Sequence, residues 1–290
     1  MAPVVEVPDG AREALFQSWF VTLRDPVARP PLFLGLELTM YACAALTFAH
    51  ALRARRAGEA WPPLLWASTF AYGLLIEIVS YNFVDNFTHG PFTLMFYRDK
   101  LPLYVSVLYP VFIYTAAITV RRLGLGRVAE PLVTGLAIVA IDFPFDVSGP
   151  VARWWAWADG DPNIAYRWHG VPVTSYYWHL AFGGILVALC RWLAGFVSRR
   201  RHPLAASLAL AFPIGLGTMV LGFLAFFPFH ILKALHVSDG LIVGALLGIS
   251  ALVAVVARKT PAPKRERGLT AVLGIWYGYH AIVAFALVAR

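Results

Sequence analysis

Charged residues are scarce in this chain. Asp, Glu, Lys and Arg make up 14% of its 290 residues, whereas an ordinary soluble domain carries about 25%. Hydrophobic residues make up 59%, and the mean hydropathy is +0.67. So few charges leave too little polar surface for a water-exposed protein of this length. The composition therefore excludes a soluble enzyme, a nucleic-acid-binding module and a disordered linker, and it indicates a polytopic membrane protein.

Cysteines and cofactor motifs are also sparse. The two cysteines, Cys43 and Cys190, fall inside apolar stretches, so no disulfide framework is expected. The sequence has no Gly-x-Gly-x-x-Gly pattern after a strand, no paired helical histidines of the haem type and no cysteine cluster. We therefore expect no redox cofactor, and we assign no metal ligands.

The chain is instead rich in apolar stretches that are long enough to cross a bilayer core of about 30 Å. Each stretch predicts a helix, because backbone groups in lipid must be hydrogen-bonded within their own segment. We predict an all-α, polytopic bundle of about eight transmembrane helices, or seven if one of the last two does not cross, in one domain over residues 32–290. The expected spans are residues 32–52, 61–83, 101–120, 129–149, 173–197, 203–229, 237–257 and 269–289.

The net charge of +8 is concentrated in four short gaps between these spans. Short loops rich in Arg and Lys stay in the cytoplasm, so the alternation of spans predicts that both termini are non-cytoplasmic. The basic residues thus indicate topology, and nucleic acid is not an expected partner. Arg outnumbers Lys by 20 to 4, which favours a bacterial source and its inner membrane. The clusters are Arg53, Arg55 and Arg56; Arg121, Arg122 and Arg127; Arg199, Arg200 and Arg201; and Arg258, Lys259, Lys264, Arg265 and Arg267.

Apolar residues before the first span recur at helical spacing among charged residues. The pattern is typical of an amphipathic helix that lies on a membrane surface, here over residues 8–29, and Pro30-Pro31 would end it. We predict that residues 1–31 form an interfacial amphipathic segment. The apolar residues of this pattern are Ala11, Leu15, Phe16, Trp19, Phe20 and Leu23.

Ionisable side chains share one depth in four of the spans. Glu37, Glu77, Asp142 and His179 each lie five to seven residues from the outer end of a span, or about 8–10 Å below the outer surface. Asp146 is one turn above Asp142 on the same face. Such groups are costly in a bilayer and usually mark a site, so we predict a polar cavity that opens outward. Around its mouth we expect Asn82, Asp85, His89, Arg153, His169, Tyr176, Tyr177 and His230.

Single members of this set also have structural interpretations. A lone buried carboxylate such as Glu37 is often a hydrogen-bond partner within a bundle. His280, deeper in the last span, is typical of a packed core histidine. The prediction of a cavity therefore depends on the set and not on one residue.

From Glu77 onward the sequence resembles the carotenoid biosynthesis membrane family, which includes the bacterioruberin-type carotenoid hydratases. The match covers about residues 70–195, and the chain departs from the family pattern at Tyr176-Tyr177-Trp178-His179. The resemblance implies a distant relative with a substrate of its own. The matching elements, in order, are Glu77, His89-Gly90-Pro91-Phe92, Leu101-Pro102-Leu103-Tyr104, Asp142-Phe143-Pro144-Phe145-Asp146, Trp155-Ala156-Trp157 and Gly170-Val171-Pro172.

The resemblance implies an acid–base enzyme that acts on a lipophilic, isoprenoid-like substrate. A carboxyl kept neutral by desolvation would protonate an alkene, and aromatic faces would stabilise the resulting cation. Glu77 or Asp142 would be the acid, and Asp146 or His179 would orient water. The same groups would serve a hydratase, a cyclase or a double-bond isomerase. As substrate-binding residues we predict Glu37, Asn82, Trp155, Trp157, His169, Tyr176 and Tyr177.

Two other classes of function use the same residue types. Glu, Asp and His suit a metal-dependent membrane hydrolase, although no His-x-x-x-His or Glu-x-x-His pair stands in a span. Buried acids and histidines also form proton relays in transporters and receptors. The expected partners are a lipophilic small molecule and membrane lipids, and the sequence leaves the oligomeric state open.

Overall fold

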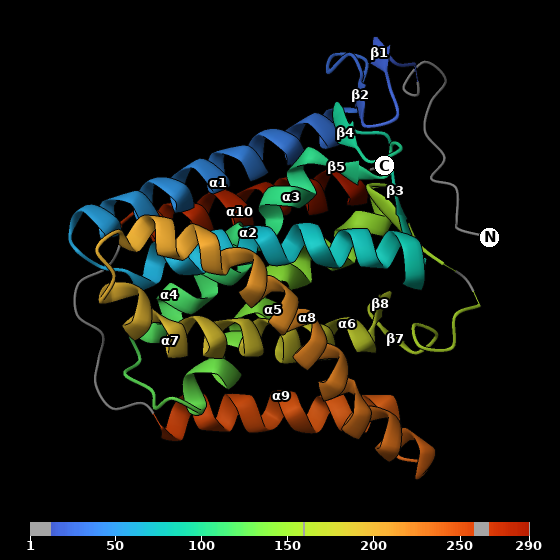
Figure 1. Ribbon diagram of the computed structural model, residues 1–290. Coiled ribbons are helices and arrows are strands. Elements are labelled where there is room, and N and C mark those ends of the chain that lie inside the picture. Colours follow the sequence, from blue (N-terminus) through green and yellow to red (C-terminus); the bar gives the residue numbers. More distant parts are fainter. Residues whose placement is uncertain (1–12, 159, 258–266, 290) are drawn as a thin grey trace.

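The computed structural model describes residues 13–158, 160–257 and 267–289, and its helices run back and forth between two ends of a bundle (Figure 1). In this part of the chain eight helices are long and apolar enough to cross a membrane. The prediction of an all-α, polytopic bundle with eight spans is confirmed. The spans are α1 (Pro31–Arg56), α2 and η1 (Trp61–Val79, Ser80–Val84), α3, η2 and α4 (Leu103–Tyr109, Pro110–Tyr114, Thr115–Arg121), α5 (Ala129–Val151), α6, η3 and α7 (Val173–Trp178, His179–Gly183, Gly184–Ser198), α8 (Pro203–Ala234), α9 (Asp239–Val256) and α10 (Arg267–Val288).

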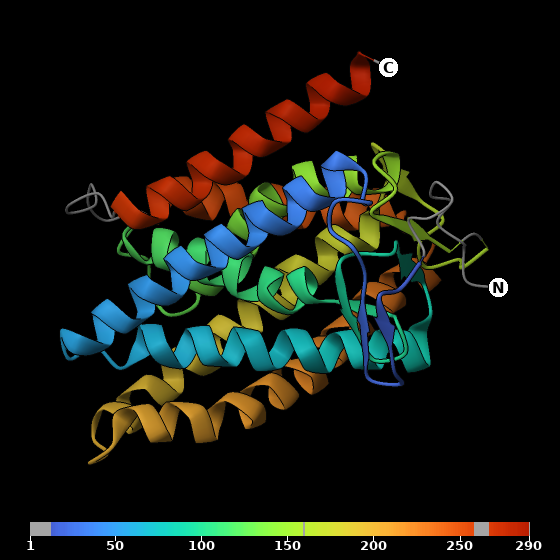
Figure 2. The same ribbon diagram turned by 90° about the horizontal axis from the view of Figure 1, so that it is seen from above.

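Helix α5 lies inside the bundle, because it packs against α4, α7, α9, α10 and η3. Helix α10 runs along α1, as Figure 2 shows from above. Aromatic rings fill the space between these helices: the Phe112 and Trp276 ring centroids are 4.9 Å apart, and Phe145 stands 5.8 Å from Trp276. The Trp276 indole N–H donates to the Ile141 carbonyl at 2.8 Å, so its one polar group is satisfied in the core.

Short strands gather at one end of the bundle (Figure 1). They come from the N-terminal segment and from the two longer loops, α2–α3 and α5–α6. The pair β3–β6 joins these two loops, with Phe87 opposite Trp157 and His89 opposite Trp155. The strands are β1 (Phe16–Gln17), β2 (Val21–Leu23), β4 (Leu94–Phe96) and β5 (Leu101–Pro102) in one sheet, β3 (Phe87–His89) with β6 (Trp155–Trp157), and β7 (Arg167–Trp168) with β8 (Val171–Pro172).

The predicted amphipathic helix over residues 8–29 is wrong in the described part of that segment, which begins at residue 13. The chain there forms the hairpin β1–β2, and β2 pairs with β4 of the α2–α3 loop. Phe16 and Trp19, expected on an apolar helix face, are more than half exposed, whereas Thr22 and Arg24 are buried. Pairing with β4 supplies the backbone hydrogen bonds and therefore overrides the helical spacing. An interfacial position of the segment stays a prediction.

The basic clusters lie at the opposite end from the strands (Figure 1). Arg53 to Arg56, Arg121 to Arg127 and Arg199 to Arg201 occupy the ends of α1, α4 and α7 and the connections that follow them. Of the fourth cluster, Arg258, Lys259, Lys264 and Arg265 lie outside the described residues, and Arg267 begins α10. The chain is thus a multi-pass membrane protein, while its orientation and its bacterial source stay predictions.

Three of the described spans contain a π-helical turn. Each of these turns, η1, η2 and η3, widens a helix by one residue, a feature frequent at functional sites. The turns η2 and η3 lie inside their spans, whereas η1 is the last turn of its span. Tyr109 directly precedes η2, and His179 begins η3. Pro110 explains η2, since it has no N–H to donate to the preceding helical turn.

The contact between α5 and η3 leaves no room for a side chain at Gly135. A Cβ atom there would stand 2.7 Å from Leu180 Cα and 2.8 Å from the Leu180 carbonyl oxygen. Gly135→Ala should therefore lower the free energy of unfolding by about 1–3 kcal/mol through overpacking. Thermal unfolding in detergent measures this loss as a fall in Tm.

Gly248→Ala is the matched control, because a Cβ on this helical glycine meets nothing within 4 Å. It should leave Tm unchanged or raise it slightly, since alanine favours a helix. Equal Tm values for the two variants would contradict the close approach of α5 and η3.

Candidate functional site

A cavity of about 500 Å³ lies in the half of the bundle that carries the strands. Helices α2, α3, α5, α6 and α8 form its walls, and β3 and β6 close it at the end. The volume is typical of sites for small organic ligands. Its ionisable lining residues are Glu77, His89, Asp142, Asp146, Asp161, His179 and His230.

The four residues predicted to be catalytic, Glu77, Asp142, Asp146 and His179, all line this one cavity. They come from three spans and are buried or half-buried. The structure thus brings together in space what the sequence places at one depth. Their catalytic role stays a prediction.

Two facing helices form the first polar cluster of the cavity. Asp142 and Asp146 lie one turn apart on α5, and Ser175 and His179 lie one turn apart across α6 and η3. His179 Nε2 stands 2.6 Å from Asp142 Oδ2, and the Ser175 hydroxyl donates to Asp146 Oδ2 at 2.7 Å. Asp142 and Asp146 are 3% and 7% exposed. Two carboxyl groups, an imidazole and a hydroxyl are therefore linked in a site shielded from water.

This cluster also has the composition of a metal site. One possible ligand atom from each of Asp142, Asp146 and His179 lies within 4.8 Å of the other two. Carboxylate and imidazole ligands suit Zn²⁺ and Mn²⁺. The sequence offered a metal site only as an alternative, because His179 lies on another helix than the two acids and the three donors follow no short ligand motif.

The second polar cluster centres on Glu77. The Tyr109 hydroxyl donates to Glu77 Oε1 at 2.5 Å. The other carboxylate oxygen, Oε2, stands 3.9 Å from His89 Nε2. His89 comes from β3, and its Nδ1 lies 3.5 Å from the Tyr104 hydroxyl. Two tyrosines thus orient an acid and an imidazole that face the cavity.

Aromatic side chains form most of the remaining wall. Trp155 and Trp157 line the cavity as predicted, and Phe145 packs against Trp155 with ring centroids 4.3 Å apart and the ring planes tilted by 44°. Phe227 and Val84 line the cavity and are also 68% and 37% exposed on the surface of the bundle. The cavity wall therefore reaches the surface of the bundle through apolar side chains of α8 and η1, and through the exposed Asn163 of the α5–α6 loop.

Five residues predicted to bind substrate lie elsewhere. Asn82 and His169 are exposed outside the cavity, and the Asn82 amide donates to the Ile78 carbonyl of its own helix. The Tyr176 hydroxyl donates to the Trp168 carbonyl at 3.4 Å, and the Tyr177 hydroxyl bonds the Ala225 carbonyl. These side chains follow the helical face that meets α8 and α9, away from the cavity. The five are Glu37, Asn82, His169, Tyr176 and Tyr177.

Three members of the two polar clusters were missing from the predicted catalytic and substrate-binding residues: His89, Tyr109 and Ser175. His89 was placed only at the mouth, although the His-Gly-Pro-Phe element singled it out. The sequence did not indicate a functional role for Tyr109 or Ser175, because an uncharged residue in an apolar span is usually part of the packed interior. Only the packing of α3 and α6 against the carboxylates identifies them.

Glu37 instead holds the loop that carries His89. Its carboxylate accepts hydrogen bonds from the Thr93 N–H at 3.1 Å and from the Thr93 hydroxyl at 2.6 Å. Arg29 donates to the Pro91 carbonyl of the same loop at 3.0 Å. The structural interpretation of Glu37 thus fits, and its role is to fix the strand end that places His89.

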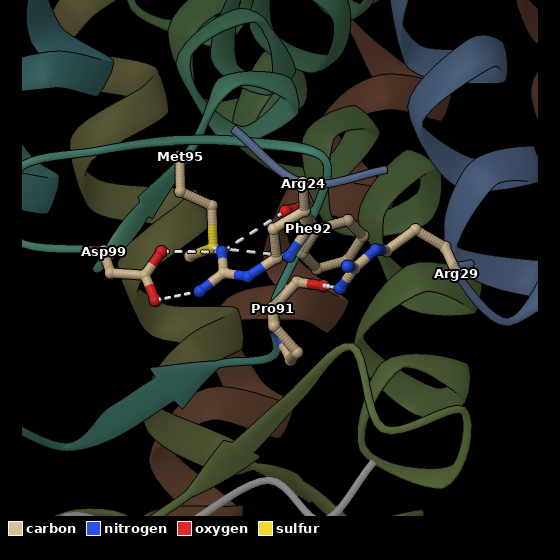
Figure 3. A network of polar contacts seen from close by, with 6 residues as sticks. All are labelled: Arg24, Arg29, Pro91, Phe92, Met95 and Asp99. Atoms are coloured by element: carbon tan, nitrogen blue, oxygen red, sulfur yellow. Dashed lines mark hydrogen bonds and ion pairs between the residues drawn. The ribbon is translucent and has the colours of Figure 1, made fainter. Parts of the chain in front are cut away.

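Arg24 of the hairpin fastens the same loop (Figure 3). Its buried guanidinium forms a two-pronged ion pair with Asp99, and it also contacts the Phe92 carbonyl at 3.5 Å and the Met95 sulfur at 3.3 Å. Burial, and next the nearby Arg24 charge, lowers the pKa of Arg29. An arginine stays cationic even so, and the two positive charges are matched to carbonyl and carboxylate oxygens.

Comparison with known proteins gives one match. A family model described as "Domain of unknown function (DUF7802)" matches residues 14–288. No curated protein and no solved structure matches the chain.

The Arg24–Asp99 ion pair should control the accessibility of the α2–α3 loop. Asp99→Asn removes the carboxylate charge that pairs with the buried guanidinium of Arg24, at a cost of about 1–2 kcal/mol for a half-buried pair. Cleavage by trypsin at Arg98 and Lys100 should then become about 5–30 times faster. The measurement is a time course of limited proteolysis in lipid nanodiscs.

Asp25→Asn is the control for this prediction. Asp25 lies near the same arginines, but its carboxylate accepts a hydrogen bond from the Val27 N–H at the surface. Its cleavage rate should match that of the wild type. A wild-type rate for Asp99→Asn as well would show that the ion pair does not fasten the loop.

Proposed function

Because this chain belongs to the DUF7802 family, whose description assigns no activity, we propose a function from the cavity itself: acid–base catalysis on a lipophilic, isoprenoid-like substrate within the membrane. The observation that carries the proposal is the convergence of Glu77, Asp142, Asp146 and His179 on one cavity with mostly aromatic and aliphatic walls. Apolar walls suit a hydrocarbon, and ionisable groups at a few points suit proton transfer.

The cluster of Asp142, Asp146 and His179 is suited to donate and recover a proton. One ligand atom from each of these residues lies within 4.8 Å of the other two, so the cluster can hold a proton and pass it between its groups. That proton would form a C–H bond with one carbon of an alkene, whose π electrons supply the bond. The positive charge would then lie on the other carbon, near the rings of Phe145, Trp155 and Trp178, which line the cavity.

Three outcomes complete this step, and each balances without a cofactor. Attack by water forms a C–O bond, and the second water proton returns to a carboxylate, which amounts to hydration. Attack by a second alkene of the same molecule gives a cyclised cation that loses a proton. Loss of a different proton gives a shifted double bond. The resemblance to carotenoid hydratases favours hydration.

The function is tested by mass spectrometry of lipid extracts from cells that express the protein in a host that makes isoprenoids. Asp142→Asn and Glu77→Gln should each lower the amount of product about 100-fold or more, because each removes an acid–base group. A product heavier than its precursor by one water molecule supports hydration. An unchanged mass with altered retention supports cyclisation or isomerisation.

Glu130→Gln is the matched control for loss of a buried carboxylate. Glu130 is 1% exposed and pairs with Arg191 at 2.9 Å, on α5 and α7, but it does not line the cavity. The amount of product per amount of protein in the membrane should be the same for Glu130→Gln as for the wild type. The proposal would be contradicted if lipid extracts from cells with a normal amount of wild-type protein in the membrane have the same composition as extracts from cells with the empty vector.

A second candidate, a metal-dependent membrane hydrolase, is favoured by the close approach of Asp142, Asp146 and His179. A bound metal would lower the pKa of a coordinated water and supply a nucleophile. If this candidate holds, purified wild type should retain about one equivalent of zinc or manganese after dialysis, and Asp146→Asn should lose it. Elemental analysis decides the matter, since metal-free wild type with full activity rules the hydrolase out.

A further inference from the structure

Two polar atoms face each other across part of the cavity without a hydrogen-bond partner among the described residues. They are Glu77 Oε2 and His89 Nε2, and both side chains are only 6% exposed. Their separation of 3.9 Å is too long for a direct hydrogen bond. Buried polar atoms left unpaired cost free energy, so native proteins rarely keep them without a ligand or water.

The opposite atoms of the same two groups are already held. Glu77 Oε1 accepts from the Tyr109 hydroxyl, and His89 Nδ1 lies beside the Tyr104 hydroxyl. The backbone of His89 is fixed by pairing with Trp155 in β3–β6. Glu77 and His89 therefore cannot turn toward each other without breaking these contacts, and the two free atoms stay aimed at the space between them.

We propose that Glu77 and His89 bind one oxygen atom, the hydroxyl of an isoprenoid alcohol or the water that becomes it. An oxygen about 2.8–2.9 Å from each atom fits between two groups 3.9 Å apart. A hydroxyl is suited to this position because it accepts from the imidazole N–H and donates to the carboxylate. A bare hydrocarbon offers neither interaction.

Two further polar atoms of the cavity wall support a polar ligand. Asn86 Oδ1 and Trp157 Nε1 line the cavity, are buried and have no hydrogen-bond partner within the described chain. They come from the same end of the cavity as His89, since β3 and β6 pair there. The free polar atoms thus gather on the wall formed by α2, β3 and β6.

This inference rests on the proposed function and assigns its two tasks, proton transfer and binding of the oxygen atom, to different residues. Asp142, Asp146 and His179 supply and recover the alkene proton, while Glu77 and His89 hold the oxygen that bonds the neighbouring carbon. His89 thereby becomes a binding residue of the site. In the reverse direction the same pair holds the leaving water, as microscopic reversibility requires.

Thr115 provides the matched control. Its side chain is 0% exposed, and its hydroxyl, like the free atoms of Glu77 and His89, has no hydrogen-bond partner in the described part of the chain. Thr115 lies on α4 and does not line the cavity. Thr115→Val removes a buried, unpaired hydroxyl of the bundle without changing a cavity residue.

The test compares the binding of geranylgeraniol with that of the hydrocarbon that lacks only its hydroxyl group. Quenching of tryptophan fluorescence in nanodiscs reports binding, since Trp155 and Trp157 line the cavity. Wild type and Thr115→Val should bind the alcohol about tenfold more tightly than the hydrocarbon, as expected for two buried hydrogen bonds. His89→Phe and Glu77→Met should bind the two probes within about twofold of each other. Unchanged hydrocarbon binding shows that the variants keep the cavity.

Equal affinity of wild type for the two probes would overturn the oxygen site, and so would a tenfold preference that survives in His89→Phe and Glu77→Met. If hydrocarbon binding is lost in both, His89→Leu and Glu77→Leu, which also remove the polar atoms, decide by the same ratio. The outcome is separable from that of the proposed function. An alcohol preference without any new lipid product would support the oxygen site and contradict the proposed enzymatic function. A new lipid product without the alcohol preference would support the enzymatic function and contradict the oxygen site.

Discussion

The cost of burying a carboxyl group among apolar helices determines how this bundle is assembled. Five acidic side chains are nearly inaccessible in the described spans, and each meets a partner from another element. Glu130 pairs with Arg191, Asp142 with His179 and Asp146 with Ser175, while Glu37 and Glu77 accept hydrogen bonds from Thr93 and Tyr109. These contacts join α5 to α6–η3 and α7, α1 to the α2–α3 loop, and α2 to α3. A group that is costly when alone thus becomes a specific link between helices.

The partners differ in how many of each acid's oxygen atoms they bind. This difference distinguishes the acids that only join helices from those that can also bind a ligand. Glu37 is bonded through both oxygens, and Glu130 has a full countercharge, so neither has capacity left for a ligand. Glu77 uses one oxygen and presents the other to a cavity. Two of the π-helical turns lie at cavity residues, since Tyr109 directly precedes η2 and His179 begins η3.

The sequence predicts the part of this architecture that depends on apolar length and on depth. Spans follow from hydropathy, and Glu77, Asp142, Asp146 and His179 meet because equal depth on neighbouring helices brings them near one another. Which helices are neighbours, and which face each presents, depends on packing that one sequence does not encode locally. Tyr176 and Tyr177 were misplaced for this reason. The helix predicted over residues 8–29 failed because its hydrogen bonds go to β4, far along the chain.

The exposed position of Phe227 and Val84 at the side of the cavity has a kinetic consequence. A ligand dissolved in the bilayer reaches this surface by lateral diffusion in two dimensions and never crosses the water layer. Its encounter rate then depends on its surface density in the membrane and not on its concentration in solution. A sparingly water-soluble hydrocarbon partitions into the bilayer and reaches a high concentration there. A cavity with low affinity for it is then still largely occupied.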